Sequence, residues 1–172
     1  MPLLIPDLFT ACEAGCLPLR GFCQTDRFSC GVSAGWSAIH LLTKPHKGQG
    51  NFRQFARDCA ADPVWGTSTK RLTNALRKQG MKVGTRPLSW ATVREMTALG
   101  RPMITSIAYK TYRHWVVIYG HSRSEVFYSG RILPGFSRTR MRWADFKKIC
   151  EPTCLTISRG APRLAQSLKQ HP

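Results

Sequence analysis

One cysteine in this sequence stands where a thiol is easily activated. Cys30 ends the stretch QTDRFSC, and from Gly31 onward apolar residues recur at helical spacing. A thiol at the N-terminus of a helix meets unpaired backbone N–H groups and the positive end of the helix dipole, and both favour the thiolate. We therefore expect Cys30 to act as a nucleophile if a base lies beside it. Without a base, a cysteine at this position would be only a small buried hydrophobic residue.

Two other residues are suited to assist Cys30. Gln24 lies six positions earlier, and its amide N–H together with the backbone N–H of Cys30 could hold a developing oxyanion. His114 begins the apolar strand pattern HWVVIYGH, where its imidazole could face the helix end, lower the thiol pKa and form an ion pair. The alternative for His114 is a core or edge histidine whose hydrogen bonds are satisfied. His121, seven positions on, is expected on the opposite face if the strand is regular.

The elements that must position these residues follow from hydrophobic periodicity and from capping and turn residues. Helix patterns come first and strand patterns come late, and two of the strands are joined by the hairpin GHSRS. This order predicts an α+β fold in which the first helix, carrying Cys30, packs against an antiparallel sheet that carries His114. The predicted helices cover residues 31–42, 52–61, 68–79, 89–99 and 141–150, and the predicted strands cover residues 81–88, 101–109, 114–121 and 125–133.

The order and spacing of these segments resemble a known family, the papain-like cysteine peptidases that remove double-glycine leaders from bacteriocins, with their free-standing bacterial relatives. In that family Gln-x5-Cys-Gly is followed by a Gly-Thr-Ser helix, a Gly-x-Pro strand and His-x-Val-Val-x-x-Gly. The matching segments here are QTDRFSCG, GTSTKRLTNALRKQGMKV, GRPMITSI and HWVVIYGH, within about residues 24–145. The resemblance implies a papain-like fold, with Cys30 as nucleophile, His114 as general base and then acid, and Gln24 as oxyanion donor.

The sequence departs from this family at the residue that orients the histidine. The family ends the strand after the histidine with Asp-Pro, whereas here Ser129 and Gly130 occupy the corresponding place and no carboxylate is present. Ser129 is the predicted substitute, because its hydroxyl could accept a hydrogen bond from the imidazole; a backbone carbonyl or an ordered water could do the same. Glu125 is expected to lie too far away, and Asp145 to be a solvated or capping helix residue. The residue in this place only orients the imidazole of His114, so activity could survive its loss. The alternative is that this chain is a degenerate, inactive member of the family.

These residues together predict a cysteine peptidase that acts on a peptide or protein substrate and needs no cofactor. The same Cys–His pair could instead deamidate a glutamine or transfer an acyl group, because only the entering and leaving groups differ. The competing class is a papain-like module that binds nucleic acid or an acidic partner through a basic surface. It is suggested by 26 Lys and Arg against 9 Asp and Glu, a net charge of +17, although these charges are scattered along the chain. Trp65, in a loop near the expected cleft, is the tryptophan we consider for substrate contact.

The remaining cysteines allow several states. Seven cysteines are an odd number, so at least one thiol is unpaired. Two pairs with the same spacing, Cys12 with Cys16 and Cys150 with Cys154, could together hold a structural zinc ion if the two ends of the chain meet. Disulfides among these four are the alternative in an exported protein. Otherwise we expect reduced, half-buried thiols.

A length of 172 residues with 42% hydrophobic content predicts one globular domain over residues 1–172. Residues 1–23 are expected to form an N-terminal loop region, and residues 160–172 a flexible tail. No apolar run approaches the ~20 residues that span a bilayer, and the opening segment lacks the basic start of a signal peptide. We therefore expect a cytoplasmic protein or one exported without a cleaved signal; a secreted effector and a processing enzyme both fit.

Overall fold

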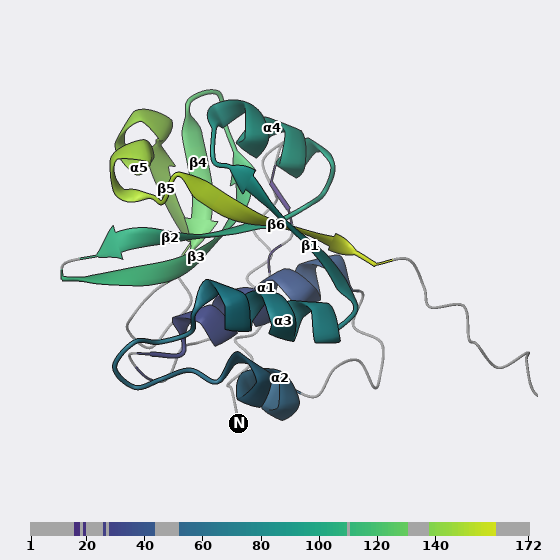
Figure 1. The fold of residues 1–172 in the computed structure, drawn as a ribbon. Coiled ribbons are helices and arrows are strands. Elements are labelled where there is room, and N and C mark those ends of the chain that lie inside the picture. The colour runs from purple at the N-terminus through teal and green to yellow at the C-terminus, as the bar shows by residue number, and fades with distance from the viewer. Residues whose placement is uncertain are drawn as a thin grey trace, which may run out of the picture.

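The computed structural model describes residues 16, 17, 19, 26, 28–43, 52–109, 111–130 and 138–160. The helices are α1 (Cys30–Leu42), α2 (Phe52–Cys59), α3 (Thr69–Lys78), α4 (Trp90–Ala98) and α5 (Trp143–Ile149). The strands are β1 (Met81–Pro87), β2 (Met103–Tyr109), β3 (Tyr112–His121), β4 (Glu125–Ser129), β5 (Arg138–Arg142) and β6 (Thr153–Arg159). In this part of the chain, six strands form one antiparallel sheet in the order β1-β6-β2-β3-β4-β5. Helices α1, α2 and α3 lie on one side of the sheet, and α4 and α5 on the other (Figure 1).

This arrangement confirms the predicted α+β class, because the helix that carries Cys30 packs on the antiparallel sheet that carries His114. Strands β5 and β6 are additions that the sequence patterns do not predict. The β5 sequence RTRMR has one apolar residue, so it lacks the alternation of a half-buried strand. Strand β6 lies beyond the last predicted helix, yet it inserts between β1 and β2 and buries Leu155 and Ile157.

Helix α1 is enclosed by the sheet on one side and by α2 and α3 on the other. Gly35 makes this close packing possible, since a Cβ there would lie 2.6 Å from Phe55 Cζ and 2.9 Å from Leu72 Cδ1. Phe55 and Leu72 are themselves completely buried. The first helix is therefore held on both sides, and its N-terminal residue Cys30 is fixed relative to the strands.

Serine side chains cap two of the helices. Ser68 accepts a hydrogen bond from the backbone N–H of Arg71 at the start of α3, and Ser89 accepts one from Thr92 at the start of α4. The glycines that follow these two helices, Gly80 and Gly100, have φ of +77° and +68°. Within the described residues, none of the helices has the length and apolar character needed to cross a bilayer.

The sheet separates two apolar cores, and both are filled by side chains of β3. The core on the α1 side includes Val32, Trp36, Ile39, Phe55, Leu72, Leu76, Val117 and Ile157. The core on the α4 and α5 side includes Val93, Met96, Val116, Ile118, Tyr128 and Phe146. Because successive residues of β3 contribute to opposite cores, this strand is anchored from both faces.

Strand β3 is irregular near its end, where its register with β4 shifts between Ile118 and Gly120. After this bulge His121 lies against α4, with its Nδ1 atom 2.8 Å from the Thr97 hydroxyl and its ring 5.7 Å from that of Trp90. The expectation that His121 and His114 face opposite sides assumed a regular strand, and the bulge removes that regularity.

Candidate active site

The start of α1 is fixed by an aspartate that precedes it. Asp26 Oδ1 accepts hydrogen bonds from the backbone N–H of Phe28 at 2.9 Å and of Ser29 at 2.6 Å. The side chain of Ser29, the N-cap residue, makes no capping bond of its own. The carboxylate therefore folds the chain into a turn immediately before Cys30 and determines where the thiol enters the helix.

Gly31 joins the helix start to the rest of the site. A Cβ at this residue would lie 2.7 Å from Thr67 Cβ and 3.1 Å from Trp115 Cδ1, so a larger residue would force these groups apart. Trp115 Nε1 in turn donates a hydrogen bond to the carbonyl of Thr67 at 2.8 Å. The first turn of α1, the loop before α3 and strand β3 therefore meet immediately beside Cys30.

The Cys30 thiol is buried, with 7% of the residue exposed. Burial is the largest effect on its pKa and raises it, and the negative charge of Asp26 raises it further. Hydrogen bonds from the backbone N–H groups of Trp115, Gly31 and Cys30 itself lower the pKa, but they do not offset burial. The expected help from the helix terminus is present, yet the net shift is opposite to the expected one, because the thiolate would lose its hydration.

His114 lies directly before Trp115, the residue whose backbone N–H reaches the thiol. Its imidazole is 3% exposed. Burial lowers its pKa from 6.5 to about 4, although a hydrogen bond with the backbone of Gly130 raises it in part. Near neutral pH both groups therefore rest uncharged, as thiol and imidazole. This differs from the expected ion pair, and the cause is again the loss of hydration around a charge.

The third position of the site has no side-chain carboxylate. Ser129, at the end of β4, is buried and pairs with Val117 of β3. The next residue, Gly130, hydrogen-bonds to the imidazole through its backbone. Of the two acids considered from the sequence, Glu125 contacts the Ser122 hydroxyl in the β3–β4 hairpin. The other, Asp145, lies in α5 and accepts hydrogen bonds from Arg142, just before the helix, and from Lys148 within it. Ser129 as the orienting residue stays a prediction.

Two side-chain atoms in the described part of the chain are buried without a hydrogen-bond partner, and both belong to this region. They are Nε2 of His114 and Oγ1 of Thr67. The hydroxyl of Thr67 borders Gly31, because a Cβ on that glycine would lie 3.0 Å from it. Buried polar atoms are usually paired, so these two unpaired atoms mark His114 and Thr67 as unusual within the described residues.

Some predicted site residues cannot be placed. Gln24, the predicted oxyanion donor, and Cys12, one of the four predicted zinc ligands, lie outside the described residues. Among the residues described, no group of three His, Cys, Asp or Glu side chains could hold a metal ion. Burial raises the pKa of Cys59 to about 12 and that of Cys154 to about 11, so both thiols stay protonated near neutral pH. Nearly all of the predicted N-terminal loop and C-terminal tail also lies outside the description.

Three residues of the site were not assigned to it from the sequence. Asp26 has a recognisable signal, an aspartate shortly before a helix start, which is a common capping pattern. Thr67 has a signal only through its place in the Gly-Thr-Ser segment. Gly130 was noted as the place of a missing acid, but its own contact with His114 depends on the register of β4 against β3 and has no local signal.

An exposed apolar pair lies at the tip of the loop that leads to Thr67. Val64 is 77% exposed and Trp65 is 87% exposed. Asp62 holds the tip, because its Oδ1 atom accepts hydrogen bonds from the N–H of Val64 at 2.8 Å and of Trp65 at 2.9 Å. The backbones of Asp62 and Gly66 are also paired in both directions. The two apolar side chains are thus displayed by a hydrogen-bonded turn only two residues from Thr67.

No family model and no curated protein matches this chain. Solved structures do. A double-glycine motif protease from an AMS/PCAT transporter, in complex with its leader peptide, has a TM-score of 0.67 at 16% identity, covering 86% of this chain and 96% of that one. The peptidase domain of Streptococcus ComA, a bifunctional ABC transporter, has a TM-score of 0.63 at 17% identity, covering 86% and 99%. The peptidase domain of Streptococcus mutans ComA has a TM-score of 0.50 at 15% identity, covering 78% of this chain and 95% of that one. The chain therefore has the papain-like fold of these peptidase domains, as the sequence resemblance predicted.

Proposed function

We propose that this protein is a cysteine peptidase in which Cys30 is the nucleophile and His114 is first the base and then the acid. The observation that carries the proposal is that the backbone N–H of Trp115 lies close enough to the Cys30 thiol to lower its pKa. This contact joins the first residue of α1 to the residue next to His114, in a fold that the chain shares with two peptidase domains. A fold supports many activities, so the proposal depends on this local arrangement as well.

The chemistry follows from a pair that begins uncharged. As the Cys30 sulfur bonds to the carbonyl carbon of the substrate, its proton moves to the imidazole of His114. The imidazolium then gives that proton to the leaving amine, the C–N bond breaks and a thioester remains. Water attacks the thioester, passes one proton to the imidazole and releases the acid, and the thiol regains its proton. We assign the oxyanion to the backbone N–H of Cys30 and to the amide of Gln24.

We propose that the substrate is a peptide with a double-glycine motif, as in the AMS/PCAT transporter protease, whose structure contains a leader peptide. Two features of this chain support a peptide of that kind. A thiol that is only 7% exposed admits a scissile bond flanked by small residues more easily than one flanked by large residues. The exposed Val64 and Trp65 next to the site offer an apolar contact for a longer side chain of the same peptide.

The test is cleavage of a synthetic peptide that carries a Gly-Gly motif followed by a short cargo, read by mass spectrometry. We expect a single cut after the second glycine. Cys30→Ala should abolish it and His114→Ala should slow it by about 10²–10⁴-fold. Cys150→Ser, which changes another free thiol, should leave it intact. Cleavage that persists in Cys30→Ala would contradict the proposal.

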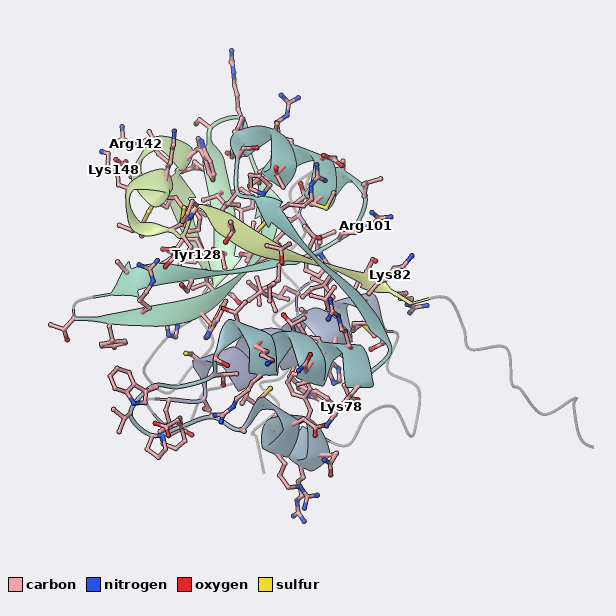
Figure 2. All side chains as sticks on the ribbon, viewed as in Figure 1. Lys78, Lys82, Arg101, Tyr128, Arg142 and Lys148 are labelled. Atoms are coloured by element: carbon pink, nitrogen blue, oxygen red, sulfur yellow. The ribbon has the colours of Figure 1, made fainter. Side chains whose placement is uncertain are left out.

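The second candidate is a degenerate module that binds an anionic partner, and the missing carboxylate is the observation that favours it. The basic side chains labelled in Figure 2 do not gather on one face: Lys78 lies on α3, whereas Arg142 and Lys148 lie at α5 on the other side of the sheet. This scatter argues against a single polyanion site. A folded wild-type protein that neither cleaves nor transfers any acyl group would nevertheless favour the module.

A further inference from the structure

Gly130 occupies the place where the resembling family carries its orienting acid, and the structure shows what stands there. Its φ is +154°, in a region that side-chain-bearing residues rarely adopt. A Cβ on Gly130 would lie 2.8 Å from Val116 Cγ1, 3.0 Å from the carbonyl oxygen of Trp115 and 3.1 Å from Nε2 of His114. The residue is therefore closely surrounded, and there is no vacant space in which an aspartate side chain was simply lost.

The backbone of Gly130 touches the histidine in two ways. It hydrogen-bonds to the imidazole. It also covers the ring edge at Nε2, the atom that is buried without a partner. Both contacts depend on the missing side chain, because a methyl group at residue 130 would occupy the space next to Nε2.

We propose that Gly130 is a positioning residue for His114, holding the imidazole through its backbone where related peptidases use a carboxylate. The inference rests on the proposed peptidase function for its catalytic meaning. A backbone carbonyl is neutral, so it can fix the orientation of the ring without stabilising an imidazolium as a carboxylate does. The site would then work as an oriented but uncharged thiol–imidazole pair.

The charged groups on β3 and on the neighbouring elements are paired with groups other than His114. On β3, Arg113 pairs with Glu151 and also donates to the Ser106 hydroxyl. Ile107, which pairs with His114 across β2 and β3, is bridged on its other side by the Cys150 backbone. On α5, Asp145 is held by Arg142 and Lys148, and near α1 the charge of Asp26 acts on Cys30. Among the described residues, none of these charges accounts for the pKa of His114, whose causes are burial and Gly130.

The first test observes the imidazole directly and needs no enzyme activity. Long-range ¹H–¹⁵N NMR of protein labelled at histidine distinguishes the two neutral tautomers, and His114→Gln identifies the resonance. We expect one tautomer across pH 5 to 8, without protonation, and the same tautomer in Ser129→Ala. A change of tautomer in Ser129→Ala would show that the serine hydroxyl orients the ring, and it would overturn the proposal.

The second test replaces Gly130 by alanine, with Ser129→Ala as the matched control from the neighbouring buried position. If the added methyl displaces the imidazole by about 1 Å, kcat should fall by roughly 100-fold with little change in KM. The pKa of His114 should rise toward its ordinary value, because burial is the larger of its two influences, and the acid limb of the kcat/KM profile should move up with it. A merely destabilised protein would lose activity without moving that limb.

The outcomes separate this inference from the proposed function. Unchanged His114 resonances and kcat in folded Gly130→Ala would overturn the role of Gly130 while leaving the peptidase intact. If Gly130→Ala fails to fold, the NMR comparison of wild type with Ser129→Ala decides alone. A wild-type protein that cleaves no peptide but shows the fixed neutral tautomer would retain the structural contact and remove its catalytic meaning.

Discussion

The two histidines of β3 differ in how their ring nitrogens are satisfied. His121 is partly exposed, lies 2.8 Å from the Thr97 hydroxyl through Nδ1 and packs edge-on against Trp90. His114 is 3% exposed, has a buried Nε2 without a partner and precedes the residue that hydrogen-bonds to the Cys30 thiol. The first arrangement is typical of a histidine that serves packing. The second leaves Nε2 buried without a hydrogen bond, in a residue next to the one that reaches the Cys30 thiol, which suits chemistry more than stability.

Exchanging each histidine for alanine is the strongest way to break this comparison. His114→Ala should lower kcat by about 10²–10⁴-fold, because it removes the general base. His121→Ala should retain kcat and lower only the melting temperature, through loss of its contacts with Thr97 and Trp90. Steady-state cleavage of the Gly-Gly peptide, with melting curves for both variants, measures the two effects. Equal losses of kcat in both folded variants would show that the distinction between the histidines is wrong.

Acid stability gives a second contrast. Folding lowers the pKa of His114 from 6.5 to about 4, so between these values the unfolded chain binds a proton that the folded chain does not. The stability that this group contributes is present above pH 6.5 and is lost as the pH falls toward 4. It amounts to about 3 kcal/mol. Urea unfolding at pH 7 and pH 4 should therefore show a larger drop for wild type than for His114→Gln. His121→Gln is the matched control, and an equal drop in wild type and His114→Gln would contradict the prediction.

The reactivity of the Cys30 thiol tests whether the pair is uncharged near neutral pH. Because burial raises the thiol pKa and lowers that of the imidazole, alkylation by iodoacetamide should fall about tenfold per pH unit below neutrality, as the thiolate is titrated away. Peptide mass spectrometry follows Cys30 separately from the other cysteines. A rate that stays level down to pH 5, and that disappears in His114→Ala, would instead demonstrate the ion pair expected from the sequence.

The smallest expected effect concerns Trp65, in the exposed turn that leads to Thr67. Trp65→Ala removes an 87% exposed side chain, so it should not affect folding. If the tryptophan contacts the peptide, KM should rise several-fold, corresponding to about 1 kcal/mol, with kcat and Cys30 alkylation unchanged. Leu99→Ala, at another exposed apolar position, is the control. Identical KM values in the two variants would remove Trp65 from the proposed substrate contact.

The order of elements, with Cys30 at a helix start and His114 in a strand, could be predicted because these signals are local. Helical spacing after Cys30, the serine caps and the apolar run after His114 each occupy a short stretch of sequence. The protonation state of the pair could not be predicted, because it depends on desolvation by residues such as Thr67, Trp115 and Gly130, which come from distant segments. The same reason hides the bulge of β3 near Ile118, which depends on how β4 pairs with it.

The position of β6 has a consequence for the sequence of folding events. Strands β2, β3 and β4 follow one another in the chain and pair as neighbours, so they can assemble through local hairpins. Strand β1 instead joins the sheet only through β6, with Met81 opposite Arg159. Contacts between such distant residues form slowly, because a long loop must close first. Helix α1 and strand β3 are separated by a chain of similar length, so Cys30 and His114 are also expected to meet late, at about the stage when β6 completes the sheet.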